Sequence, residues 1–212
     1  MTSFAILLGG DLVVTARLRR QIAGARVIAA DSGMIHAAAL GLIPELWVGD
    51  FDSAGSELTL RYRDIPHRRF PAEKDATDGS IAVAEAIARG ATRIVLVGGL
   101  GGQADHTAGI LGTALQVARR GIACLVTSGG EEAWPVLSGG TRIDLPPRSR
   151  LSIIPFADFL GLDLEGVKWP LHGRDVPLGS TLTMSNLAHG DVRITLGSGH
   201  GIAIAYPVSD DA

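Results

Sequence analysis

The sequence contains little cysteine and few aromatic residues, and it carries no excess of positive charge. Cys124 is the only cysteine among 212 residues, so no disulfide can form within the chain, which fits a reducing compartment. The formal net charge is -3, which provides no basic surface for nucleic acid or for an anionic membrane. The first apolar run, residues 4–8, is too short for a signal core or a membrane span. We therefore expect a cytoplasmic protein.

The first part of the chain alternates short apolar runs with helical patterns. Helices are predicted over residues 34–40, 78–89 and 106–120, and a glycine directly follows each of them. Buried strands are predicted over residues 4–8, 26–30, 46–48, 93–97 and 122–127. This alternation indicates a mostly parallel sheet with helices on both faces.

The pattern changes after about residue 128, where glycine and proline become frequent. No long helical period is found beyond that point, and short strand-like runs occupy residues 141–145, 151–156, 161–167, 181–184, 191–196 and 202–205. Such a series predicts a small sandwich or barrel. The fold class is therefore an α/β domain over residues 1–130, followed by a smaller all-β domain over residues 131–212.

Two aspartates, Asp50 and Asp52, follow the third predicted strand. Ligands of open parallel sheets bind beyond the carboxyl ends of the strands, where this pair would lie. In an extended segment the two side chains point the same way, so both carboxylates can approach one Mg2+ ion. A solvated turn at residues 51–53 explains the pair equally well.

A lysine and two aspartates, Lys74, Asp75 and Asp78, lie at the start of a predicted helix. Capping of the helix is enough to explain the aspartates, because the helix dipole favours carboxylates there. Capping does not explain Lys74. A lysine beside carboxylates suits a site in which metal and phosphate charges are balanced, so this loop favours a polyphosphate site.

A glycine-rich loop, residues 98–102, separates the fourth predicted strand from the helix that follows. Its backbone amides can approach a phosphate, and the start of the next helix favours an anion. The spacing matches a loose dinucleotide fingerprint, but residues 124–128 lack the carboxylate which that fingerprint expects, so no nicotinamide cofactor is predicted. Helix capping is the alternative explanation for Asp105, and a structural hydrogen bond is the alternative for His106. The other histidines lack metal-ligand spacing, which argues against zinc.

Taken in order, these segments resemble the thiamine pyrophosphokinase family, and the resemblance covers nearly the whole chain. The matching segments are Asp31-Ser32-Gly33, Pro44-x-x-x-x-Gly49-Asp50-Phe51-Asp52-Ser53, Glu73-Lys74-Asp75-x-Thr77-Asp78, Gly98-Gly99-x-Gly101-Gly102-x-x-Asp105-His106-Thr107, Ser152-Ile153-Ile154-Pro155, Gly166-Val167-Lys168-Trp169-Pro170-Leu171 and Ser185-Asn186. The resemblance implies a homodimer that transfers pyrophosphate from ATP to the hydroxyl of thiamine, with Mg2+, to give thiamine diphosphate and AMP.

The resemblance also implies roles for individual residues. Asp50, Asp52 and Asp78 would bind Mg2+, with Asp75 as a fourth candidate. Lys74 would balance phosphate charge, and Asp105 would hold the loop or orient the nucleophile. The residues expected at ATP are Asp31, Ser32, Gly98, Gly99, Gly101, Gly102, Gln103, His106 and Thr107.

The resemblance places thiamine at the subunit interface, beside Trp169, Ser185 and Asn186. An aromatic face suits a flat, cationic ring system, which gives Trp169 a physical reason to be there. A plain core tryptophan and a turn-forming Ser185-Asn186 pair are the alternatives.

Three positions depart from the family pattern: Ser32 replaces a glycine, Gln103 replaces an arginine, and Gly79 replaces a larger apolar residue. Gln103 removes a fixed charge near the phosphates, which leaves open a sensor that binds ATP and thiamine without turnover. An aspartate-dependent phosphatase is a further alternative, because Asp50 and Asp52 follow a strand. Ala54, however, stands where that class has threonine or valine.

Overall fold

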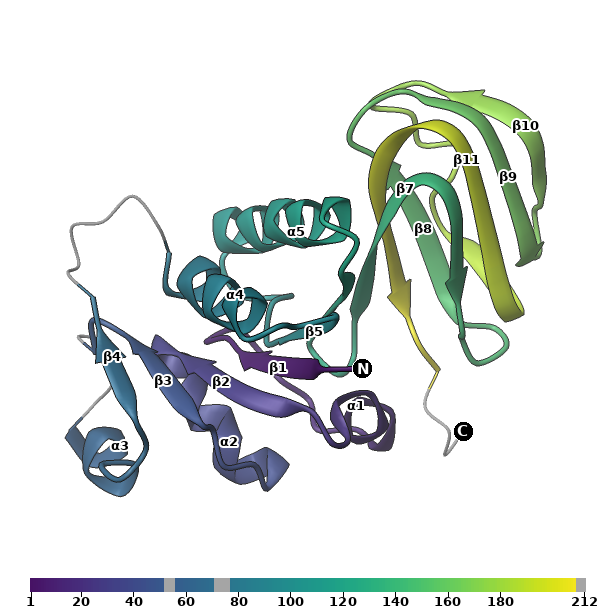
Figure 1. Ribbon diagram of the computed structural model, residues 1–212. Coiled ribbons are helices and arrows are strands. Elements are labelled where there is room, and N and C mark those ends of the chain that lie inside the picture. Colours follow the sequence, from purple (N-terminus) through teal and green to yellow (C-terminus); the bar gives the residue numbers. More distant parts are fainter. Residues whose placement is uncertain (52–55, 71–76, 209–212) are drawn as a thin grey trace.

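The computed structural model describes residues 1–51, 56–70 and 77–208 (Figure 1). Within these residues, eleven strands join into one sheet with the order β10-β9-β11-β7-β6-β5-β1-β2-β3-β4, and β8 pairs with β11. The sheet has a parallel half and an antiparallel half. The predicted succession of an α/β part and an all-β part is confirmed, but the two parts share one continuous sheet. No helix in the described part of the chain is long and apolar enough to cross a membrane.

The parallel half contains the five predicted strands and one that was not predicted. They are β1 (Ser3–Leu7), β2 (Arg26–Ala30), β3 (Leu46–Gly49), β4 (His67–Arg69), β5 (Arg93–Val97) and β6 (Ala123–Thr127). The unpredicted strand is β4, which lies at the edge of the sheet and has three exposed residues. It carries no apolar pattern because it buries no side chain.

Helices cover both faces of the parallel half (Figure 1). They are α1 (Ala16–Ile22), the 3-10 helix η1 (Asp31–Met34), α2 (Ile35–Leu40), α3 (Ser56–Arg61), α4 (Asp78–Ala88) and α5 (Ala104–Arg119). Phe4 and Ile6 of β1 pack with α4 and α5, whereas Ala5 and Leu7 pack with α1 and α2. Side chains alternate along a strand, so both faces of β1 are buried and its sequence is a continuous apolar run.

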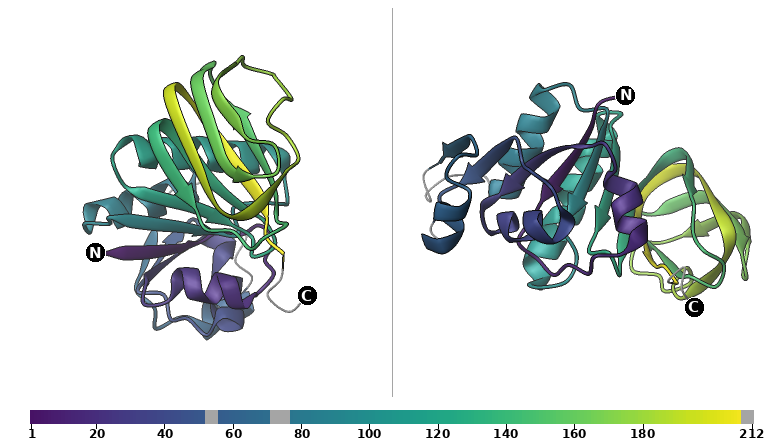
Figure 2. Two further views of the ribbon diagram at one scale, coloured as in Figure 1. Left: turned by 90° about the vertical axis from the view of Figure 1, so that its right-hand side faces the viewer. Right: turned by 90° about the horizontal axis from the view of Figure 1, so that it is seen from below.

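The antiparallel half continues the sheet through β7 and folds over a core of its own (Figure 2). Its strands are β7 (Glu132–Ile143), β8 (Arg150–Pro155), β9 (Phe159–Val167), β10 (Leu171–Val176) and β11 (Asn186–Tyr206). The predicted strands 191–196 and 202–205 are parts of the single strand β11, whose pairing with β7 shifts between Leu196 and His200.

The prediction of a strand at residues 181–184 was wrong, because this segment forms turns. The Thr183 hydroxyl donates a hydrogen bond to the Ile153 carbonyl, and the Thr183 carbonyl accepts one from the Ile153 N–H at 3.0 Å. These contacts attach one residue to the sheet without continuing a ladder. Thr183 is the one buried residue of this segment, and the other three are exposed.

The strand order reverses between β1 and β5. The chain moves outward from β1 through β2, β3 and β4, and then returns to β5 on the other side of β1. At such a reversal the loops that follow the two strands diverge to opposite faces, which leaves a crevice beyond their carboxyl ends. The edge of the sheet above β1 and β5 is therefore the expected position of a ligand site.

Candidate active site

The loops that follow β5 and β1 are in direct contact. The Gly10 N–H donates a hydrogen bond to the Gly98 carbonyl at 3.1 Å. A Cβ atom added to Gly10 would lie 2.4 Å from that oxygen, so only glycine permits this approach. Gly98 itself has a φ of 76° and would place a Cβ 2.5 Å from the Leu8 carbonyl oxygen.

The contacts continue from β1 to β2 and β3. A Cβ on Gly9 would lie 2.2 Å from the Ser32 hydroxyl, and one on Gly49 would lie 3.2 Å from Asp31 Oδ1. The loops after β5, β1, β2 and β3 thus form one continuous rim at the carboxyl edge of the parallel strands. Such a gathering of loops is what a parallel sheet leads one to expect. Ser32, which departs from the family pattern, fits because Gly9 opposite it has no side chain.

The backbone is strained at two non-glycine residues of this rim. Asp31 has a φ of 43° and Phe51 has a φ of 66°. The left-handed region costs a non-glycine residue roughly 1 kcal/mol or more, and such residues concentrate at functional sites. Trp47 supports both, because its Nε1 donates to the Asp31 carbonyl at 2.8 Å and its ring meets the Phe51 ring edge-on at 4.8 Å.

The glycine-rich loop is tied to the start of α5. The Thr107 hydroxyl donates to the Gly101 carbonyl at 2.9 Å, and the Thr107 N–H donates to the Gln103 carbonyl at 3.0 Å. Gln103 is the N-cap residue, but its side chain makes no capping bond. Asp105 and His106 are exposed in the first turn, where Asp105 Oδ1 accepts from the His106 N–H at 2.8 Å. This helix start faces a glycine-lined rim, an arrangement that suits a phosphate.

Two of the predicted metal ligands are described by the structure. Asp50 follows β3, and Asp78 is the first residue of α4, whose Thr77 cap accepts a hydrogen bond from the Ser80 N–H at 3.2 Å. The helix packs against β1, β2 and β3. Gly79 is buried there, and an added Cβ would lie 3.1 Å from the Leu8 side chain, so glycine allows close packing at this departure from the family pattern.

The other members of the predicted cluster, Asp52, Lys74 and Asp75, lie outside the described residues. Within residues 1–51, 56–70 and 77–208, no group of three histidine, cysteine, aspartate or glutamate side chains is placed to hold a metal ion. The predicted cluster therefore depends on the segments that carry Asp52 and Asp75.

The loop after β1 was missed by the sequence analysis. Gly9 and Gly10 complete the rim, and Asp11 lies beside the glycine-rich loop, since a Cβ on Gly101 would be 3.1 Å from Asp11 Oδ2. His36 also contacts this loop, with Nε2 at 2.9 Å from the Gly10 carbonyl oxygen. The sequence contained a signal for this loop. Gly9-Gly10-Asp11 directly follows the first predicted strand, and the other site residues were found because they follow strands in the same way.

A second candidate site lies in the antiparallel half, where a cavity of about 300 Å³ includes Trp169 and Asn186 in its lining. The Trp169 ring is half exposed, and Lys168 Nζ lies 4.6 Å from its centroid. Trp169 is therefore not a core tryptophan. Ser185, in contrast, is not among the lining residues, and its N–H donates to the Ser152 hydroxyl at 3.0 Å.

The remaining lining residues of this cavity were not predicted. They are Leu164, Leu171, Leu182, Thr183 and Met184. Three of them belong to the turn segment that was mistaken for a strand. In the sheet order, β11, β7 and β6 stand between β9, beside this cavity, and β5, beside the rim. The two candidate sites therefore occupy different halves of the molecule.

Both halves of the chain match family models of known proteins. Residues 22–126 match the family model "Thiamin pyrophosphokinase, catalytic domain", and residues 141–200 match "Thiamin pyrophosphokinase, vitamin B1 binding domain". The thiamine pyrophosphokinase of Bacillus subtilis is 31% identical over 188 residues, which cover 86% of this chain and 87% of that protein.

Solved structures give the same result for the fold. The crystal structure of the Bacillus subtilis thiamine pyrophosphokinase superposes with a TM-score of 0.86 at 27% identity, over 99% of this chain and 100% of that one. The thiamin pyrophosphokinase of Geobacillus thermodenitrificans superposes with a TM-score of 0.81 at 26% identity, over 99% of each chain. The yeast enzyme, at 14% identity, shares the fold with a TM-score of 0.78, over 98% of this chain and 86% of that one.

Proposed function

Because the chain belongs to the thiamin pyrophosphokinase family, we propose that it transfers the pyrophosphate group of ATP to thiamine. The thiamine hydroxyl attacks the β-phosphorus, the bond from that phosphorus to the α-phosphate oxygen breaks, and AMP leaves with both electrons of that bond. The hydroxyl proton is released, and thiamine diphosphate forms without a covalent enzyme intermediate. The observation that carries this proposal is the rim of contacting glycine loops at the β1–β5 reversal.

The proposed ATP site is the rim itself. The glycine loop and the start of α5 offer backbone N–H groups and the positive end of a helix dipole to the phosphates. Gly99 acts differently from the other glycines, because a Cβ there would lie 2.6 Å from Val126 and 2.9 Å from Ile110. Its role is to let the loop pack on the core. The residues proposed to contact ATP are Asp31, Ser32, Gly98, Gly101, Gly102, Gln103, His106 and Thr107.

The carboxylates at the rim fit a magnesium ion. Asp50 and Asp78 are partly exposed oxygen donors at the end of a strand and the start of a helix, and a hard cation prefers such ligands. We propose that they hold Mg2+ together with Asp52, and that Asp75 contributes directly or through water. Bound there, the ion would neutralise charge on the polyphosphate. Lys74 would add a further positive charge, and Asp105 would hold the loop or orient the thiamine hydroxyl.

Thiamine is proposed to bind in the cavity beside Trp169, and the protein is proposed to act as a homodimer. Within one chain this cavity and the rim lie in different halves of the sheet, so a second subunit is needed to bring a thiamine site to an ATP site. Three large hydrophobic side chains in the lining of the cavity are about half exposed, and a partner subunit would cover them. They are Trp169, Leu182 and Met184. We propose that residues 1–130 form the catalytic domain and residues 131–212 the thiamine-binding domain.

The test is to incubate the protein with ATP, Mg2+ and thiamine, and to separate the products by chromatography. Equal amounts of AMP and thiamine diphosphate are expected, with neither formed when thiamine is omitted or EDTA is added. Binding of both substrates without AMP release would instead support a sensor. That alternative arises because Gln103 replaces an arginine of the family pattern. Acyl-phosphate trapped on Asp50 would support a phosphatase.

A further inference from the structure

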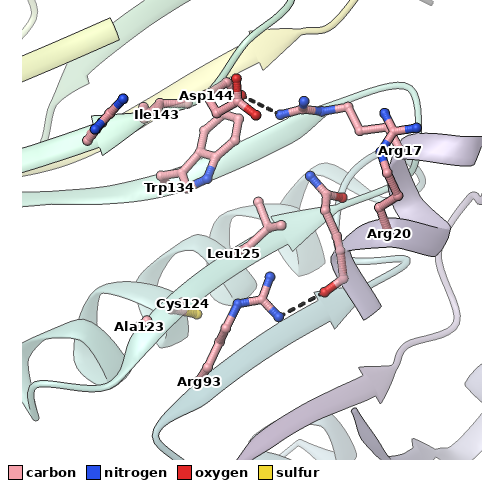
Figure 3. Close-up of a pocket in the computed structure, with 11 residues that line it drawn as sticks. Arg17, Arg20, Arg93, Ala123, Cys124, Leu125, Trp134, Ile143 and Asp144 are labelled. Atoms are coloured by element: carbon pink, nitrogen blue, oxygen red, sulfur yellow. Dashed lines mark hydrogen bonds between the residues drawn. The ribbon is translucent and has the colours of Figure 1, made fainter. Parts of the chain in front are cut away.

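A larger cavity of about 450 Å³ lies away from both candidate sites (Figure 3). It is bounded by α1, by the first residues of β5 and β6, and by β7. Arg17 and Arg20 come from α1, Arg93 from β5, and Trp134 and Arg142 from β7. Figure 3 shows Trp134 and Arg93 on opposite sides of this space, with Arg17 reaching from α1 to Asp144, whose carbonyl accepts a hydrogen bond from it at 2.6 Å.

None of the residues proposed for ATP, Mg2+ or thiamine lines this cavity. Arg93 is the first residue of β5, whereas the glycine-rich loop follows the last residue of the same strand. A five-residue strand spans about 16 Å at roughly 3.3 Å per residue. The cavity therefore lies at the opposite edge of the parallel sheet from the rim.

Positively charged side chains predominate in the lining of this cavity. Four guanidinium groups and one carboxylate, that of Asp144, are among its lining groups. Two of the arginines are paired with carboxylates outside the lining: Glu132 accepts two hydrogen bonds from Arg17, at 2.7 and 2.9 Å, and Asp191 forms an ion pair with Arg142. Arg20 has an interaction partner as well.

Arg93 is the arginine whose environment most favours an added anion. Its guanidinium donates to the Gln21 carbonyl at 2.8 Å and to the Ser3 hydroxyl at 3.2 Å, and both acceptors are neutral. Among the described residues, no carboxylate forms an ion pair with it. Arg93 is partly buried, and this burial lowers the pKa of its guanidinium. A desolvated charge is stabilised when a counter-ion and further hydrogen bonds are supplied.

The cavity also has apolar lining residues. They are Trp134, which is partly buried, together with Leu125 and Ile143, and they share the lining with the charged side chains. An indole next to guanidinium groups offers a flat surface for a ring and charged donors for its substituent. The volume is within the range of about 300–1,000 Å³ that holds small organic ligands.

We propose that this cavity is a second ligand site, which binds a small anion that carries a phosphate or pyrophosphate group and a flat ring. Arg93 would donate to the phosphate, and Trp134 would contact the ring. AMP and thiamine diphosphate both have this chemistry. The proposal goes beyond the proposed reaction and needs no turnover, so it can fail while the proposed function holds.

The experiment uses full-length protein labelled with 5-fluorotryptophan and observed by 19F NMR in EDTA. The chain has three tryptophans, and Trp134→Phe identifies the signal of Trp134. AMP and thiamine diphosphate are titrated separately, and inorganic pyrophosphate serves as the probe that lacks a ring. A saturable shift of the Trp134 signal is expected with at least one ring compound, at lower concentration than with pyrophosphate. If that shift occurs with only one of the two ring compounds, that compound is the ligand.

Arg93→Gln is expected to raise the apparent Kd of this titration at least tenfold, whereas Arg93→Lys retains charge and weakens binding less. Arg63→Gln is the matched control, because Arg63 is exposed on the far side of the sheet, before β4. The unliganded 19F spectrum reports whether each variant is folded. The proposal is overturned if neither ring compound moves the Trp134 signal, if only Trp169 or Trp47 responds, or if folded Arg93→Gln and Arg93→Lys both titrate like the parent protein.

Discussion

The side chain of Asn186 forms hydrogen bonds with both main-chain polar groups of Trp169. Its Oδ1 accepts from the Trp169 N–H at 3.1 Å, and its Nδ2 donates to the Trp169 carbonyl at 2.8 Å. Asn186 is 6% exposed, whereas Trp169 is 53% exposed. A buried amide therefore fixes the backbone of the residue whose ring is presented to the proposed thiamine cavity.

Asn186→Asp should weaken thiamine binding more than it slows turnover. The carboxylate can still accept from the Trp169 N–H, but it cannot donate to the carbonyl, which loses a buried hydrogen bond worth about 1–3 kcal/mol. We expect the KM for thiamine to rise roughly tenfold or more, since 1.4 kcal/mol corresponds to a factor of ten. Steady-state kinetics with varied thiamine and saturating ATP measures this. An unchanged KM in a folded variant would show that Asn186 does not position Trp169 for the substrate.

Gly10→Ala should destabilise the protein and raise the KM for ATP, because the new methyl group would lie 2.4 Å from the Gly98 carbonyl oxygen. The loops after β1 and β5 would have to separate, at a cost above about 1 kcal/mol. Gly109→Ala is the matched control, since Gly109 lies within α5 and its added Cβ would meet nothing within 4 Å. That variant should be more stable by about 0.5–1 kcal/mol. Urea unfolding with ATP kinetics compares the two, and equal effects would contradict the close contact of the loops.

Asp50→Asn should remove most turnover and leave the fold intact, because the amide keeps the shape of the side chain but not the charge that a magnesium ligand needs. We expect the same of Asp52→Asn. Formation of AMP and thiamine diphosphate measures the loss, and the urea midpoint reports the fold. Asp64→Asn, at a carboxylate that is 93% exposed, is the control. Near-normal AMP release by Asp50→Asn would refute the proposed role of Asp50.

End signals alone do not separate the helices that were predicted from those that were missed, because α1 was missed although the Thr15 hydroxyl caps it by accepting from the Leu18 N–H at 3.0 Å. Helix α4 has the Thr77 cap and ends before Gly90, and α5 ends before Gly121. Helix α1 was missed because only Leu18 and Ile22 are fully buried in it and its other positions are mostly arginines. Two apolar residues at a spacing of four are too few to form a periodic pattern.

Much of the rim could be predicted because residues after parallel strands must gather at one edge. What could not be predicted is which loops touch, since the contacts of Gly9 with Ser32 and of Gly10 with Gly98 depend on the order of the strands. Trp169 and Asn186, which line the proposed thiamine cavity, were expected there by resemblance. The segment 181–184 was mistaken for a strand because Thr-Leu-Thr-Met alternates polar and apolar residues, but in the structure it is Thr183 that is buried, and Leu182 and Met184 are exposed.

Glu132→Gln should cost far more stability than the loss of a surface ion pair. Glu132 is 1% exposed and accepts from Arg17 at 2.7 and 2.9 Å and from the Gln21 side chain at 2.8 Å. Removing one partner of a buried pair costs about 3–5 kcal/mol, because the other charge stays buried. Asp191→Asn breaks the more exposed pair with Arg142, which is worth at most about 1 kcal/mol. Urea unfolding compares them, and similar losses would mean that Glu132 is replaceable.

The thiol of Cys124 should react slowly at neutral pH. Burial raises its pKa to about 12, although the nearby charge of Arg93 acts in the opposite direction. Thiolate is the reactive form, so at pH 8 we expect alkylation by iodoacetamide to be more than about a hundredfold slower than in urea-unfolded protein, where the pKa is roughly 8.5. Mass spectrometry of timed samples measures both rates. Alkylation of the folded protein at the unfolded rate would show that Cys124 is open to solvent.

The same pKa difference predicts a dependence of stability on pH. Below about pH 8.5 the thiol is protonated in both states, so it adds no pH dependence. Between that value and about 12, the unfolded chain binds fewer protons than the folded one, so the free energy of unfolding decreases as pH rises. The slope from one group reaches at most about 1.4 kcal/mol per pH unit. Other groups titrate in this range, so the test is the difference between the parent protein and Cys124→Ala, measured by urea unfolding from pH 8 to 10.5. Parallel curves would mean that the folded and unfolded thiols have the same pKa.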